Sequence, residues 1–151
     1  MSAILEDFSI EVMPRTLAKV DFLETLLPRG SRVYVAHIDG VEFQDMLATA
    51  KRLSEAGYRV MPHIPARIVS NAKILESWVE RYVGEANVSE ALLLAGSPTT
   101  PCGDLADSMQ LIQTGLFEKY QFKRLHVAGH PEGNKDIDPD GSGEKVREAL
   151  A

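Results

Sequence analysis

The chain has 151 residues, of which 44% are hydrophobic and 25% are charged, a composition typical of a globular domain with a substantial core. Its formal net charge of −6 argues against nucleic-acid binding, because a general attraction to phosphates needs an excess of Lys and Arg. We therefore expect a single domain over residues 1–151 that binds a small molecule.

The N-terminal sequence lacks the basic stretch and apolar run of a targeting signal, and no run of about 18 apolar residues follows it. The expected location is cytoplasmic, without membrane contact. The one cysteine, Cys102, excludes an internal disulfide and a cysteine-based zinc site.

Short β-branched or aliphatic runs alternate with longer segments of helical period, a pattern typical of βαβ units and a parallel sheet. The predicted strands cover residues 8–12, 32–36, 59–64, 90–95 and 124–128. The predicted helices cover residues 16–27, 43–56, 71–85 and 104–119, and a further one begins near residue 142. Gly57 is expected to end the second helix in a left-handed conformation, and Asn71 to cap the third.

Five strands that alternate with helices fit two architectures: an open doubly wound five-stranded sheet, or part of an eight-stranded (β/α) TIM-type barrel. Length favours the open sheet, because a complete barrel needs roughly 200 residues or more. Two observations favour the barrel. Polar residues follow several strands instead of gathering at one switch point, and the last helical pattern reaches Ala151 without a terminating Gly or Pro.

Titratable residues follow the predicted strands at their carboxyl ends, where parallel α/β folds bind ligands. Glu11 ends the first strand, His37 and His63 follow the second and third, and His130 and Glu132 follow the fifth. A structural role is the alternative for each single histidine.

The fourth strand runs into a hydroxyl-rich segment that begins with Gly96 and Ser97, and its backbone NH groups can meet a ligand. His126 lies inside the fifth strand, so we expect it to pack or to face outward.

Glu11 is the strongest candidate for catalysis. It lies between Ile10 and Val12 in the sequence, so we expect its carboxyl group to be partly removed from water, which favours the protonated form that a general acid needs. The alternative is a structural ion pair with Arg15 or Arg67.

Four segments resemble the methylenetetrahydrofolate reductases. Residues 8–16 (FSIEVMPRT) resemble the family's S-F-E-F-F-P-P-K/R-T opening, and residues 62–64 (PHI) resemble its AHLT element. Residues 90–96 (EALLLAG) resemble its LALRGD strand, and residues 127–134 (VAGHPEGN) resemble its VAAYPEGHP element. The matches occur in the family's order over almost the whole chain, which implies about the first four and a half units of an eight-unit barrel.

The resemblance implies an oxidoreductase of folate one-carbon metabolism. In the family, NAD(P)H reduces a bound FAD, and the flavin passes hydride to the methylene carbon of methylenetetrahydrofolate. Glu11 matches the family's catalytic acid and would protonate N10 of the pterin as the five-membered ring opens. The positions that would bind the cofactor are His63, Gly96, Ser97, His130, Glu132, Asn134 and His37.

The chain departs from the family at several flavin contacts. Ala95 and Ser97 stand where the family has an Arg and an Asp, and His130 and Asn134 replace a Tyr and a His. Loss of a cation and an anion would weaken flavin binding. A flavin-independent folate- or pterin-binding relative, or a methyl-transfer relative, is therefore the second interpretation.

A metal-dependent barrel hydrolase is the third interpretation, with His37, His63, His130 and Glu11 as ligands, although no HxH or HExxH spacing supports it. No metal site is predicted. The acidic segment 136–141 matches the start of a calcium loop, but Arg147 occupies the place of the bidentate Glu.

An incomplete barrel would leave two strand edges and a large apolar surface uncovered. We therefore expect a homo-oligomer, or a partner that supplies the missing half.

Overall fold

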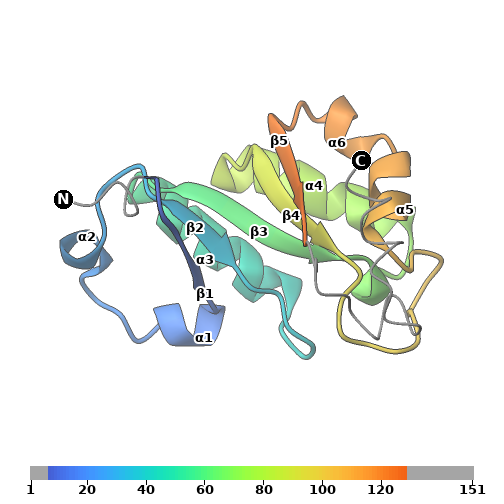
Figure 1. Cartoon of the computed structure of the whole chain (residues 1–151), viewed down its shortest axis with the longest axis horizontal. Coiled ribbons are helices and arrows are strands. Elements are labelled where there is room, and N and C mark those ends of the chain that lie inside the picture. Colours follow the sequence, from blue (N-terminus) through green and yellow to red (C-terminus); the bar gives the residue numbers. More distant parts are fainter. Residues whose placement is uncertain (1–6, 129–151) are drawn as a thin grey trace.

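A computed structural model describes residues 7–128 of the chain. Five strands form one parallel sheet: β1 (Ser9–Val12), β2 (Arg32–Val35), β3 (Arg59–Pro65), β4 (Glu90–Leu94) and β5 (Arg124–Val127). They lie side by side in chain order, with β1 and β5 as the edges of the described sheet (Figure 1). The predicted α/β fold with a parallel sheet is confirmed.

The longer helices cover one face of this sheet. The connecting segments contain α1 (Pro14–Leu17), α2 (Leu23–Leu26), α3 (Phe43–Glu55), η2 (Ala66–Ile68), α4 (Ala72–Ala86), α5 (Ser108–Gln113) and α6 (Leu116–Lys119). Helix α3 packs against β2, β3 and α4, while α5 contacts β4, so the core lies between the sheet and the helices (Figure 1).

The two faces of the sheet differ in polarity because successive side chains of a strand point to opposite faces. Val33 and Val35 are fully buried toward the helices, whereas Arg32 and Tyr34 between them are only partly buried. Register partners share a face, so the face opposite the helices, here named the polar face, carries Ser9, Glu11, Arg32, Tyr34, Arg59, Met61, His63, Glu90, Leu92, Arg124 and His126.

Strand β3 joins the two parts of the sheet. Its residues 59–62 pair with β2, and its residues 63–65 pair with β4. The carboxyl-terminal half of β3 therefore lies beside β4, while its first half holds β2 and, through β2, β1.

The single helix predicted over residues 16–27 is wrong. The structure has two short helices there, because the guanidinium group of Arg52 on α3 donates hydrogen bonds to the carbonyl oxygens of Leu17 and Val20. These bonds satisfy carbonyl groups at the end of α1, and the chain turns before α2 begins.

The single helix predicted over residues 104–119 is also divided. Asp107 caps α5 by accepting a hydrogen bond from the backbone NH of Gln110, so the helix starts late. Gly115 has a φ of 69°, which interrupts the helical path before α6.

Two predicted caps are confirmed. Gly57 follows α3 with a φ of 87°, and Asn71 caps α4 by accepting a hydrogen bond from Ile74 at 3.0 Å. The helix predicted near residue 142 lies outside the described residues. No helix within residues 7–128 combines the length and the apolar character that a membrane crossing needs.

Candidate functional site

Glu11 and His63 meet at the carboxyl-terminal part of the sheet. Oε2 of Glu11 on β1 lies 3.2 Å from Nε2 of His63 on β3. The side chains come together over β2. Glu11 is paired in register with Tyr34 on β2, and Tyr34 is paired with Met61 on β3, two residues before His63. The sequence placed both residues at strand ends, and the structure brings them into contact.

Glu11 is not desolvated as predicted, because its side chain is 58% exposed. In a strand, the sequence neighbours Ile10 and Val12 point to the opposite face, where they pack on the helix-covered core. The apolar neighbours therefore do not surround the carboxyl group. Its exposure instead leaves it open to a substrate.

The alternative role of Glu11, an ion pair with arginine, is not found within residues 7–128. The guanidinium group of Arg67 donates from Nε to the carbonyl of Ala106 at 3.0 Å and from Nη1 to the carbonyl of Pro98 at 3.1 Å. Arg67 therefore supports the segment after β4.

His63 is an imidazole in a largely buried place, with 11% of its side chain exposed. Burial lowers its pKa, the nearby carboxylate of Glu11 opposes that effect, and the charge of His37 adds to it. The neutral form therefore predominates near neutral pH. Nε2 is shielded from solvent, and its contact with Glu11 is close without the alignment of a full hydrogen bond.

His37 is turned toward the helices. Its Nε2 donates a hydrogen bond to the carbonyl oxygen of Val41 at 2.9 Å, and its ring centre lies 5.5 Å from that of Trp78 on α4. Burial lowers its pKa. These contacts close the turn after β2, and among the described residues Nδ1 of His37 has no hydrogen-bond partner.

The segment after β4 holds Gly96 and Ser97. Gly96 has a φ of 95°, and a Cβ atom added there would lie 2.9 Å from the Cβ of Pro65. The side chain of Ser97 is exposed. Within the described chain, no protein group accepts a hydrogen bond from the backbone NH of Gly96 or Ser97, so both NH groups are available to a ligand.

His126 lies on the polar face and packs against Tyr34, in line with the expectation that it packs or faces outward. The ring of Tyr34 stands edge-on between two imidazoles, with ring centres 6.2 Å from His63 and 6.3 Å from His126. His126 and His63 are both register partners of Leu92, so the alternation of the strands could have placed them on one face. The polar face thus carries a row of titratable groups beside Glu11.

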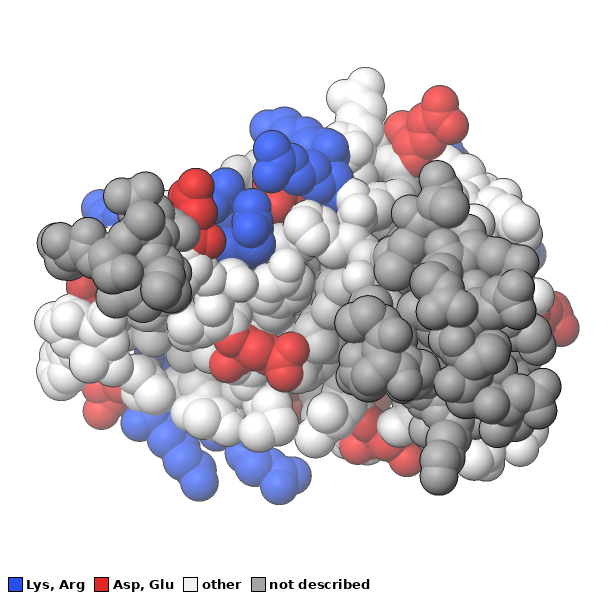
Figure 2. All heavy atoms as spheres, in the orientation of Figure 1, with Lys and Arg blue, Asp and Glu red and all other residues white. Residues whose placement is uncertain are grey.

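A half-buried ion pair lies nearer the amino ends of the strands. Nε of Arg32 lies 3.8 Å from Oε2 of Glu90 across β3, and the exposed side chains of Arg59 and Arg124 share this face. Figure 2 shows basic side chains gathered at the upper edge of the face, where β5 begins in Figure 1. This end of the face is basic, whereas Glu11 lies at the other end.

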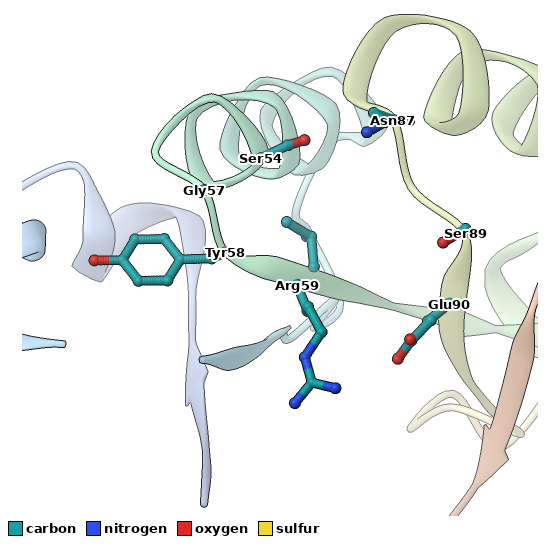
Figure 3. A pocket seen from close by; sticks show the side chains of 8 residues that line it. Ser54, Gly57, Tyr58, Arg59, Asn87, Ser89 and Glu90 are labelled. Carbon is teal, nitrogen blue, oxygen red and sulfur yellow. The ribbon is translucent and has the colours of Figure 1, made fainter. Parts of the chain in front are cut away.

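An open pocket of about 300 Å³ lies at the amino edge of the sheet. It is lined by residues from the ends of α3 and α4 and the starts of β3 and β4, and Figure 3 shows Arg59 and Glu90 leaving their strands toward the same side. Parallel α/β folds bind ligands at the opposite edge, so this pocket is not the candidate site.

Three predicted cofactor-binding residues, His130, Glu132 and Asn134, lie outside the described residues, as does the acidic segment 136–141. Within residues 7–128, no group of three or more His, Cys, Asp or Glu side chains is placed to hold a metal ion. The hydrolase interpretation needs Glu11, His37 and His63 in one group of ligands, and the described residues contain no such group.

The described residues fit a flavin poorly. Residues 95–97 are Ala, Gly and Ser, so they supply neither the cation nor the anion of the family's flavin contacts. The guanidinium group of Arg67 is bound to Pro98 and Ala106 and does not replace the missing cation. No protein-family model matches the chain.

Proposed function

We propose that this chain forms part of an oxidoreductase of the methylenetetrahydrofolate reductase type, in which Glu11 donates a proton to the folate substrate. The contact between Glu11 and His63 is the observation that carries the proposal. These two residues match the family's acid and one of its cofactor-binding residues, and they meet where parallel α/β folds bind ligands.

The chemistry proposed for Glu11 is simple proton donation. As hydride reaches the methylene carbon, the bond between that carbon and N10 of the folate breaks, and the proton of the carboxyl group moves to N10. The carboxyl group is exposed enough to reach a substrate, and the largely buried His63 stands beside it. The resemblance assigns the origin of the hydride to NAD(P)H.

We also propose that the sheet is an arc of a (β/α) barrel. The described strands follow one another in chain order, whereas doubly wound sheets reverse the order at a switch point. Tyr34, His63 and His126 on the polar face correspond to side chains that point into a barrel. In such an arc, β1 and β5, the edges of the described sheet, would pair with further strands, and we propose that a second copy or another chain supplies them.

Light scattering coupled to size-exclusion chromatography tests the arc. We expect a dimer or a larger assembly of the purified chain. A stable, compact monomer would contradict the arc and favour the open five-stranded sheet.

Replacement of Glu11 by Gln tests the acid. The variant keeps the size of the side chain and removes its titratable proton, so we expect at least a hundredfold loss of folate reduction, on the order of general-acid contributions. NADH oxidation with an artificial acceptor should be spared. Glu42→Gln, an exposed change in the turn before α3, is the control. Unchanged folate turnover in Glu11→Gln would remove Glu11 as the acid.

A flavin-independent folate- or pterin-binding relative is the second candidate, and the uncharged segment 95–97 favours it. Purified protein that holds FAD absorbs light near ~450 nm. This second candidate would be favoured if the purified protein is colourless, cannot be reconstituted with FAD and binds folate in calorimetry.

A further inference from the structure

We propose that His63 is a positioning residue for Glu11, whose buried imidazole keeps the carboxyl group oriented in both of its protonation states. The proposal rests on the proposed role of Glu11 as the acid. It adds a function for His63 beyond the cofactor contact that the resemblance implies.

The difference in burial identifies the fixed partner of the pair. The side chain of His63 is 11% exposed and that of Glu11 is 58% exposed, with 3.2 Å between Nε2 and Oε2. His63 lies in the central strand, its register partner is Leu92, and the ring of Tyr34 packs edge-on beside it. The surrounding residues therefore hold the imidazole in place, and the imidazole limits the positions that the exposed carboxyl group can take.

A neutral imidazole suits a partner that gains and loses a proton. It carries one N–H and one lone pair, so it can donate to a carboxylate or, as the other tautomer, accept from a carboxylic acid. An arginine at the position of His63 carries donors only, so it would stabilise only the ionised form of Glu11. Arg67, which follows β3, is directed instead to the carbonyl groups of Pro98 and Ala106.

The groups around the imidazole keep it neutral. Burial and the charge of His37 lower the pKa of His63, and Glu11 is the one neighbour that raises it. Tyr34 faces the ring from β2, His126 lies beyond Tyr34 on β5, and the register partner on β4 is the apolar Leu92. Burial therefore keeps this ring neutral, and the carboxyl group of Glu11 opposes that effect.

The first test needs no substrate. Histidine ring signals of the full chain are titrated by NMR, with assignment by single His→Gln variants. Glu11→Gln removes the charge that raises the pKa of His63, so we expect the midpoint of His63 to fall and that of His37 to stay. Glu42→Gln is the matched control, because Glu42 raises the pKa of His37 and should shift that midpoint alone.

One outcome of this titration would contradict the positioning role of His63. If Glu11→Gln folds with unchanged amide spectra and leaves the titration of His63 unaltered, the two groups do not interact in solution and the positioning role is wrong.

The second test separates positioning from packing. We expect His63→Leu to lower kcat for folate reduction by about tenfold or more with little change in KM, and to alter its pH profile. His63→Gln keeps a donor and an acceptor and should recover part of kcat. Equal kcat and pH profiles in all three proteins would overturn the proposal. Absence of folate reduction in the wild type would instead refute the proposed function, and the NMR titration then decides the role of His63.

Discussion

Arg32 and Glu90 face each other across β3, with Nε and Oε2 3.8 Å apart and both atoms shielded from solvent. Their side chains are 17% and 14% exposed, so water compensates neither charge well. Glu90→Gln leaves Arg32 as an unpaired, largely buried charge. We expect the free energy of unfolding to fall by about 2 to 4 kcal/mol, measured by urea denaturation.

The double replacement Arg32→Met with Glu90→Leu removes both charges and keeps much of the volume. We expect it to recover most of the stability lost in the single variant. A double variant as unstable as Glu90→Gln would show that packing, and not charge, determines the loss.

Arg67 holds the segment after β4 through its hydrogen bonds to Pro98 and Ala106. Lysine cannot reproduce the planar arrangement of these donors, so Arg67→Lys should lower the free energy of unfolding by about 1 to 3 kcal/mol. It should also speed hydrogen exchange at residues 95–106. Arg59→Lys, an exposed arginine with one bond to the carbonyl of Gly30, is the control and should have a small effect. Equal effects of both changes would contradict this role of Arg67.

Replacement of each of two glycines by alanine should change the free energy of unfolding in opposite directions. Gly96 has a positive φ, and a new Cβ would lie 2.9 Å from the Cβ of Pro65, so Gly96→Ala should destabilise the protein by about 1 to 3 kcal/mol. Gly84 lies inside α4 with no atom within 4 Å of a new Cβ. Gly84→Ala should stabilise by about 0.5 to 1 kcal/mol. Urea denaturation measures both, and shifts of the same sign would be inconsistent with the described backbone.

Stability should decrease in mild acid. His37 and His63 both have a pKa below the ordinary value of 6.5, because burial disfavours their charged forms. The unfolded chain therefore binds more protons once the pH falls below about 6.5, at a cost of up to about 1.4 kcal/mol per pH unit for each histidine, until the folded protein also protonates. Above that pH the contribution is fully present. Unfolding by urea from pH 7.5 to 5 should show this slope, and His37→Gln with His63→Gln should flatten it.

Much of the fold follows from the sequence, because the five strands are marked by alternating or continuous apolar runs. The contact between Glu11 and His63 could be foreseen in part, since the carboxyl ends of parallel strands share one edge of the sheet. The placement of His126 on the same face as His63 required the register of β4 with its two neighbours, which periodicity does not give.

Other features depend on contacts between distant residues. The hydrogen bonds from Arg52 that end α1 join segments more than thirty residues apart, and no local sequence pattern predicts them. The exposure of Glu11 was predicted wrongly because neighbours in the sequence were treated as neighbours in space, although adjacent strand residues point to opposite faces.

The divided pairing of β3 has a consequence for how the sheet opens. Within the described sheet, the pair β1 and β2 is hydrogen-bonded to the pair β4 and β5 through this strand, and either pair alone would be a two-stranded ribbon of marginal stability. Release of β3 therefore amounts to global unfolding, whereas the edge strands can fray locally. His63 belongs to the strand whose release is global unfolding, and Glu11 belongs to an edge strand that can open locally. We therefore expect the backbone to open more slowly at His63 than at Glu11.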